Sequence, residues 1–165
     1  RPTDELFRLY ETWSKGGNGL LITGNIVVDR RYLERPGNVC IDGKQDDEQI
    51  ERLKAYALAG QKYNNSKIFA QINHAGRQSN GMVNLSPIGP SNVPLKVVPK
   101  YVIGHPTAMS LDDIIDVKER FINAVLVCQE CGFNGVQIHA AHGYLLSSFM
   151  NPIANIRNDQ YGGSL

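Results

Sequence analysis

Cysteine is scarce in this sequence, and neither sign of charge is in excess. Three cysteines are too few, and too odd in number, for the disulfide framework of a small secreted domain. The 17 basic and 16 acidic residues leave a net charge of +1, which argues against nucleic-acid or membrane-surface binding through bulk charge. No apolar run approaches the roughly 20 residues of a membrane span. The 42% of hydrophobic residues in 165 is enough for the core of a reduced, soluble, cytoplasmic protein, which is what we expect.

The two ends of the chain do not resemble natural termini. The sequence begins at Arg1 rather than at methionine, enters a predicted helix at once, and stops after YGGSL. Its first residues also lack the pattern of a signal peptide. We therefore expect residues 1–165 to form one incomplete domain that is truncated at both ends.

Three helices are predicted from capping residues and hydrophobic periodicity. Thr3 can cap the first helix, which ends at Gly16-Gly17. Its core face is predicted from the spacing of Leu6, Leu9, Tyr10 and Trp13. The second helix begins after Asp46. The third begins after Ser110, with Asp113 at the capping-box position.

Three runs rich in apolar and β-branched residues predict strands buried on both faces, at 19–28, 67–72 and 133–138. Residues 73–108 show little periodicity and are rich in proline, glycine, asparagine and serine. A structureless loop of that length is uncommon, so we expect this segment to be functional or to carry small elements of its own.

The alternation of helix and strand predicts an α/β fold with parallel strands joined by right-handed crossovers. An open doubly wound sheet and a (β/α)8 barrel both fit this order, although a barrel typically needs about 250 residues. In either fold, ligands gather at the carboxyl ends of the strands. A site is therefore expected just after Ile26, Ile72 and Ile138.

The segment CQECGFNGVQIHAAHGY, residues 128–144, carries Cys-x-x-Cys followed by His-x-x-His, the ligand types of a tetrahedral zinc site. Cys128 and Cys131 also fall on the apolar face of the third predicted helix, where free cysteine packs as a small hydrophobe. A strand between the two pairs would hold them roughly 16 Å apart. Because zinc needs all its ligands within about 2.3 Å of one point, a metal site is not expected if the strand is real.

Two histidines and a tyrosine follow the third predicted strand. The neutral imidazoles of His139 and His142 can donate hydrogen bonds to one carbonyl or phenolate oxygen and so stabilise negative charge on it. The hydroxyl of Tyr144, with a reference pKa of about 10, can give a proton to carbon. This combination predicts addition to a conjugated double bond. The hydride must then come from a flavin or a nicotinamide, because no side chain supplies one.

The other two strand ends are consistent with a flavin. Gly24 and Asn25 end the first strand, where a small residue would let the backbone approach a flat ring. Gln71 has an amide that can donate to and accept from a pyrimidine edge. Ordinary explanations remain open, since Gly24 can simply ease a bend and Gln71 can satisfy loop backbone. We interpret three further features as loop architecture: His74, Arg77 and Asn151-Pro152.

Four segments together resemble the Old Yellow Enzyme family of FMN-dependent oxidoreductases, which are (β/α)8 TIM barrels. They are LLITGN, QINHAGRQ, IHAAHGYLLSSF and NIRNDQYGGSL, and the last two at this separation are specific. The resemblance covers nearly the whole chain and implies a partial barrel, approximately strands two to four with their helices. It also implies that NADH or NADPH supplies a hydride, which FMN passes to the β carbon of an enone, enal or related electrophilic alkene or carbonyl compound.

The resemblance further implies roles for single residues. His139 and His142 match the pair that binds the carbonyl oxygen of the substrate, and Tyr144 matches the proton donor to the α carbon. Gln71 matches the residue that pairs with the flavin pyrimidine. Asn25 stands where the family usually has Gly or Ala beside the flavin.

Other parts of the family pattern are missing or structural. Arg157 and Tyr161-Gly162-Gly163 resemble the motif that closes the loop after the fourth barrel strand. The first barrel strand, the later strands and their phosphate-binding loops have no counterpart in residues 1–165, so the chain alone is expected to be inactive. The alternative is a catalytically silent barrel relative with a binding or assembly role.

Overall fold

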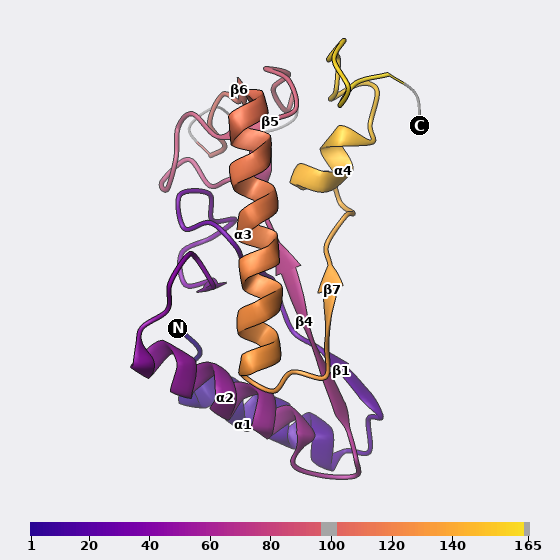
Figure 1. Ribbon diagram of the computed structural model, residues 1–165. Coiled ribbons are helices and arrows are strands. Elements are labelled where there is room, and N and C mark those ends of the chain that lie inside the picture. The colour runs from indigo at the N-terminus through magenta and orange to yellow at the C-terminus, as the bar shows by residue number, and fades with distance from the viewer. Residues whose placement is uncertain (97–101, 164–165) are drawn as a thin grey trace.

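A parallel sheet centred on β4 (Lys67–Asn73) organises the fold (Figure 1). The computed structural model describes residues 1–96 and 102–163. β4 pairs along one edge with β1 (Leu20–Ile22) and β2 (Ile26–Val27), and along the other with β7 (Gly135–Ile138). β3 (Val39–Cys40) extends the sheet beyond β2. The three predicted strand regions thus lie side by side in the order of the sequence, as in the wall of a barrel. In a doubly wound sheet the strand order would reverse direction partway across the sheet.

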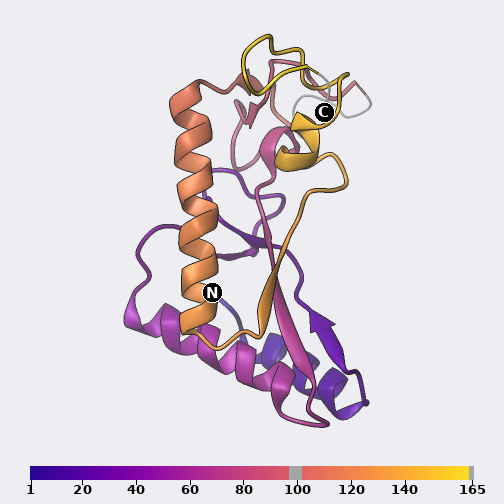
Figure 2. The same cartoon turned by 45° about the vertical axis from the view of Figure 1, so that its right-hand side comes forward.

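The three predicted helices are confirmed. α1 (Asp4–Lys15) begins at Thr3, α2 (Asp47–Gln61) at Asp46, and α3 (Leu111–Glu130) at the capping box of Ser110. Both views show α1 and α2 side by side at one end of the molecule, while α3 runs along β4 and β7 (Figures 1 and 2). The carboxyl ends of β4 and β7 point to the opposite end. Within the described ranges, no helix is long and apolar enough to cross a membrane.

Side chains of β4 alternate between two environments. Those facing the helices are fully buried in the core: Ile68, Ala70 and Ile72. Phe69 and Gln71 point to the opposite face, which is open here, because Leu20 and Ile22 of the neighbouring β1 are 51% and 40% exposed. The expectation of strands buried on both faces is therefore wrong for this chain. The inner face of a barrel is filled by side chains from all eight strands, and only some of them are present.

The strand predicted over residues 19–28 is in fact two short strands. The side-chain hydroxyl of Thr23 accepts a hydrogen bond from the backbone N–H of Gln71 at 2.9 Å, in place of a strand carbonyl. The backbone N–H of Gly24 donates to the hydroxyl of Tyr10 at 3.0 Å. The chain therefore leaves the ladder at Gly24 and Asn25 and returns to it at Ile26.

The predicted core face of α1 is only partly right. Tyr10 is buried and meets Tyr56 of α2 edge-on at 4.9 Å between ring centroids, and Leu6 is half-buried against the core. Leu9 and Trp13 are 42% and 41% exposed. The helix packs instead through the side that carries Tyr10 and Ser14, its two buried residues.

The long segment 73–108 carries small elements, as expected. It contains the 3-10 turn η1 (Gly76–Gln78) and a parallel pair, β5 (Ile88–Gly89) and β6 (Thr107–Ala108). Its residues 97–101 lie outside the described ranges. The short helix α4 (Leu145–Phe149) was not predicted, and it packs against η1 and β5.

Gly76 is where η1 meets the start of α4. Its φ of +56° disfavours any other residue, and an added Cβ would lie 2.9 Å from the Cα of Leu145. We expect Gly76→Ala to lower the free energy of unfolding of the full-length protein by about 1–3 kcal/mol, measured by denaturant titration. The matched control is Gly19→Ala, where an added Cβ meets nothing within 4 Å. Equal stability of the two variants would contradict this packing.

Candidate active site

His139, His142 and Tyr144 gather directly after β7. The backbone N–H of His139 donates to the carbonyl oxygen of Ile72 at 3.0 Å, so the parallel ladder with β4 continues to this residue. The chain then turns sharply, with positive φ at His142 (57°) and Gly143 (76°). The turn brings Tyr144 back toward His139, so one strand end and one tight turn place all three side chains.

The rings of these residues are in contact. The Nε2 atom of His139 lies 3.4 Å from the Nδ1 atom of His142. The ring of Tyr144 stands edge-on to that of His139, with centroids 4.9 Å apart at 87°. His139 is buried, whereas His142 is exposed and Tyr144 is half-buried. The group thus reaches from the sheet to the surface, where a small molecule can bind.

The environment of His139 favours its neutral form. Burial lowers the pKa of His139, and the neighbouring His142 lowers it further. A neutral imidazole has one N–H donor and one acceptor nitrogen. The Nδ1 atom of His139 accepts a hydrogen bond from the backbone N–H of Ala141 at 3.3 Å, which leaves Nε2 as the donor. His139 is therefore prepared to donate a hydrogen bond through Nε2.

Glu34 is a site residue that the sequence did not reveal. The hydroxyl of Tyr144 donates to its Oε2 atom at 2.5 Å, and the Nδ2 atom of Asn25 donates to the same oxygen at 2.6 Å. The Nδ2 atom of Asn38 donates to Oε1 at 3.1 Å. Burial raises the pKa of Tyr144 to about 12, together with the hydrogen bond and the charge of Glu34. No local pattern marks Glu34, because Tyr144 is distant from it in the sequence.

The three residues predicted to face a flavin lie at the same end of the sheet. Gln71 pairs in register with Gln137 of β7, and their side-chain amides are hydrogen-bonded to each other. An added Cβ at Gly24 would meet nothing within 4 Å, so this position is open. The Oδ1 atom of Asn25 is buried without a hydrogen-bond partner among the described residues. Amide donors and acceptors beside an open glycine suit the polar edge of a planar heterocycle.

A small cavity adjoins this group. It has a volume of about 330 Å³, and its lining includes Glu34, Arg35, Gln78 and Tyr144. The Nε2 atom of Gln78 donates to the carbonyl oxygen of His142 at 2.6 Å, which holds the turn against η1. Tyr144 is therefore reachable from this cavity.

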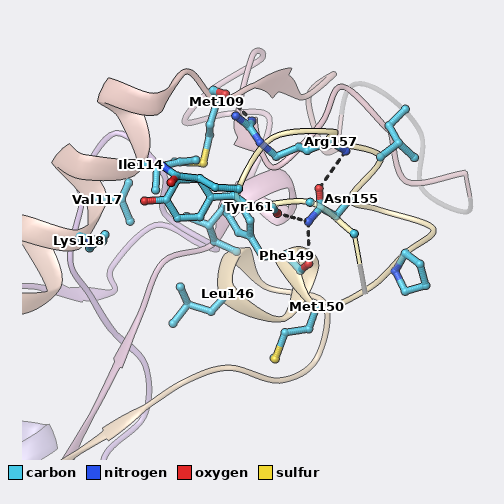
Figure 3. Close-up of a pocket in the computed structure, with 16 residues that line it drawn as sticks. Met109, Ile114, Val117, Lys118, Leu146, Phe149, Met150, Asn155, Arg157 and Tyr161 are labelled. Atoms are coloured by element: carbon cyan, nitrogen blue, oxygen red, sulfur yellow. Dashed lines mark hydrogen bonds between the residues drawn. The ribbon is translucent and has the colours of Figure 1, made fainter. Parts of the chain in front are cut away.

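Another cavity, with a volume of about 880 Å³, is a separate feature on the helix side. In Figure 3, Ile114 and Val117 of α3 line it opposite Leu146 and Phe149 of α4. None of the predicted site residues, all of which lie in the described ranges, lines it. Its lining is mostly apolar and carries no cluster of catalytic groups, so we do not assign the chemistry to it.

Arg157 ties the C-terminal loop to the long segment 73–108. Its Nη1 atom donates to the carbonyl oxygen of Met109 at 2.6 Å (Figure 3) and to that of Pro90 at 2.9 Å. Its guanidinium also pairs with Asp159. Asn155 adds hydrogen bonds to the carbonyl oxygens of Phe149 and Tyr161, both at 2.8 Å. These contacts are the loop closure that the resemblance implied.

Two of the residues interpreted as loop architecture fit that interpretation. His74 is fully buried, and its Nδ1 atom accepts a hydrogen bond from the backbone N–H of Gly76 at 3.0 Å. Burial lowers the pKa of His74 to about 4, so the ring is neutral at physiological pH. The Nη1 atom of Arg77 donates to the carbonyl oxygen of Val93 at 3.2 Å. Both residues fold the loop back on itself.

The cysteines of the Cys-x-x-Cys pattern lie away from the histidines. Cys128 and Cys131 are free and belong to the hydrophobic core beneath α3. Burial raises the pKa of both thiols, to about 12 for Cys128 and about 11 for Cys131. The strand β7 separates this cysteine pair from His139 and His142, which is the condition under which no zinc site was expected.

The neutral form of His139 can be tested by NMR titration of the full-length protein. Because burial and the neighbouring His142 both oppose its charged form, His139 should titrate below the ordinary histidine pKa of about 6.5. The signal is assigned by its loss in His139→Gln. A midpoint at or above the ordinary value would contradict the electrostatics described above.

Comparison with known proteins identifies the family. The chain matches the NADH:flavin oxidoreductase / NADH oxidase family over residues 2–165. It is 37% identical to the NADH-dependent flavin oxidoreductase nadA of Aspergillus parasiticus, covering 99% of this chain and 37% of that protein. It is 34% identical to an NADH oxidase of Thermoanaerobacter brockii, covering 98% of this chain and 24% of that protein.

A solved structure extends the likeness to the fold. The old yellow enzyme homologue from Zymomonas mobilis superposes with a TM-score of 0.82 at 28% identity, over 99% of this chain and 46% of that one. The chain thus spans less than half the length of the proteins it matches. The likeness confirms the predicted partial (β/α)8 barrel. On sequence and fold together, the chain belongs to the NADH:flavin oxidoreductase / NADH oxidase family, that of the Old Yellow Enzymes.

Proposed function

We propose that the full-length protein carrying this chain is an FMN-dependent oxidoreductase that reduces an activated alkene, with NADH or NADPH as the reductant. The observation that carries this proposal is the contact among His139, His142 and Tyr144 at the carboxyl end of β7. Because the chain spans less than half of its relatives, we assign the activity to the full-length protein and not to residues 1–165 alone.

The two histidines bind the substrate through its carbonyl oxygen. Nε2 of His139 carries the N–H of a neutral ring, since Nδ1 already accepts from the backbone N–H of Ala141, and a substrate oxygen would replace its present contact with Nδ1 of His142. His142, 3.4 Å away, adds a second donor to the same oxygen. Two hydrogen bonds polarise the conjugated system and stabilise the negative charge that develops on oxygen when hydride arrives at the β carbon.

Tyr144 supplies the proton that completes the reduction. Its pKa of about 12 keeps the hydroxyl protonated at physiological pH. The O–H bond breaks as the electron pair of the enolate forms a new C–H bond at the α carbon. The phenolate left behind recovers its proton from water through the cavity that Tyr144 lines.

The residues at the neighbouring strand ends fit FMN. Gln71 and Gln137 offer amides to the pyrimidine edge, and Gly24 leaves space for a flat ring to approach. The unpartnered Oδ1 atom of Asn25 supplies a further acceptor. When bound, FMN would supply the hydride that it accepts from the nicotinamide. An electrophilic alkene or carbonyl compound small enough for the mouth at Tyr144 is the substrate class we propose.

The variant Tyr144→Phe separates the two half-reactions of the full-length protein. Flavin reduction by NADH or NADPH needs no proton from Tyr144 and should be nearly unchanged. Reoxidation by an enone should slow about 100-fold or more, because a positioned general acid typically contributes that much. Stopped-flow absorbance measures both rates. Equal loss in the two half-reactions, or no loss in either, would refute the role of Tyr144.

A further inference from the structure

The carboxylate of Glu34 is the only charged group with a direct hydrogen bond to the hydroxyl of Tyr144 among the described residues. Glu34 lies in the loop between β2 and β3, and its side chain is 17% exposed. Its Oε2 atom accepts from both Tyr144 and Asn25, while Asn38 donates to Oε1. Three donors from three parts of the chain therefore converge on one half-buried carboxylate.

The direction of the hydrogen bond fixes where the tyrosine proton lies. An ionised carboxylate only accepts hydrogen bonds, so the single O–H of Tyr144 must point at Glu34. If Tyr144 lost its proton, a phenolate would lie 2.5 Å from a carboxylate, and the two negative charges would repel each other. The contact is thus favourable only while the proton stays on Tyr144.

The other ionisable groups around Tyr144 do not cancel this effect. Arg35 stands 3.9 Å from the Oε1 atom of Glu34, is largely exposed, and acts in the opposite direction. The ring of His139 lies edge-on to Tyr144, in an environment that favours its neutral form. Burial acts to raise the pKa of Glu34, but hydrogen bonds from Tyr144, Asn38 and Asn25 outweigh it and leave that pKa below its ordinary value. Glu34 is therefore ionised at neutral pH.

We propose that Glu34 is a positioning residue that anchors the hydroxyl of Tyr144 and keeps it protonated until a substrate displaces the hydrogen bond between them. The same oxygen also holds Asn25, so Glu34 links the proton donor to the strand end that faces the flavin. The hydrogen bonds of Glu34 described above support the anchoring itself. Its consequence for catalysis rests on the function proposed above.

The hydrogen bond to Glu34 therefore delays proton donation by Tyr144. Tyr144 must turn its O–H from Glu34 toward the α carbon before it can donate. Removing the negative charge of Glu34 should make Tyr144 a stronger acid but should also leave its hydroxyl less well oriented. A purely structural Glu34 would change neither the acidity of Tyr144 nor the pH dependence of substrate reduction.

The test is the ionisation of Tyr144 in the full-length protein, followed by NMR of ring-labelled tyrosine and assigned by the loss of the signal in Tyr144→Phe. In the wild type, Tyr144 should remain a phenol up to alkaline pH. In Glu34→Gln it should ionise at a pH lower by about one unit or more, a tenfold change in its acid constant. The matched control is Glu119→Gln, which removes the same charge from an exposed position on α3.

Glu34→Asp provides a second variant in case the amide prevents folding. Its shorter side chain breaks the 2.5 Å contact but keeps the charge, so Tyr144 should ionise at a pH between those of the wild type and Glu34→Gln. An unchanged ionisation of Tyr144 in whichever variant folds would overturn the proposal. This measurement needs neither flavin nor turnover, so it remains decisive even if the protein fails to reduce alkenes.

A kinetic measurement tests the catalytic consequence. As the pH rises, the rate of flavin reoxidation by an enone should begin to fall at a lower pH in Glu34→Gln than in the wild type. The pH dependence of flavin reduction should be the same in both. If the NMR shift is present but the two pH profiles of reoxidation coincide, Glu34 does not act on Tyr144 during the reaction and the proposal is overturned at that step.

Discussion

The parallel register between β4 and β7 determines the positions of Gln71, Gln137 and His139 at the site. Gln71 lies beside Gln137 in this register, and the hydrogen bond from His139 to Ile72 carries the ladder one residue past the end of β7. A shift of one residue would turn Gln71 and His139 toward the helices, because side chains alternate along a strand. The buried face of Ile68, Ala70 and Ile72 prevents that shift, since it would expose the core. The hydrophobic packing under the helices thus fixes the geometry of the polar groups on the other face.

Loops position the other residues of the site, Tyr144 and Glu34. The turn at His142 and Gly143 returns Tyr144 to His139, and the loop after β2 brings Glu34 against Tyr144. η1 supports this turn through the hydrogen bond from Gln78 to the carbonyl oxygen of His142. Arg157 fastens the C-terminal loop to the long segment that contains η1. Site residues that are far apart in the sequence, such as Glu34 and Tyr144, therefore lie in contact at the carboxyl end of the strands.

Features set by local interactions were predictable from the sequence. The capping box of Ser110 and the strand at β4 depend on residues close together in the chain, and both are present. Features set by distant partners were not. The interruption of the first strand depends on Thr23 bonding to Gln71, and the exposure of Trp13 depends on which side of α1 meets α2. Glu34 belongs to this second class, because no residue near it in the sequence signals a contact with Tyr144.

His139 and His142 are the proposed oxygen-binding pair beside a bound flavin in the full-length protein. The most direct measurement is its visible absorption spectrum after incubation with FMN, recorded before and after addition of a simple phenol. We expect a bound-flavin spectrum that the phenol perturbs in the wild type but scarcely changes in His139→Ala, because the phenolate loses one of its two hydrogen-bond donors. A protein that takes up no FMN, or a variant that responds to the phenol as the wild type does, would contradict this proposal.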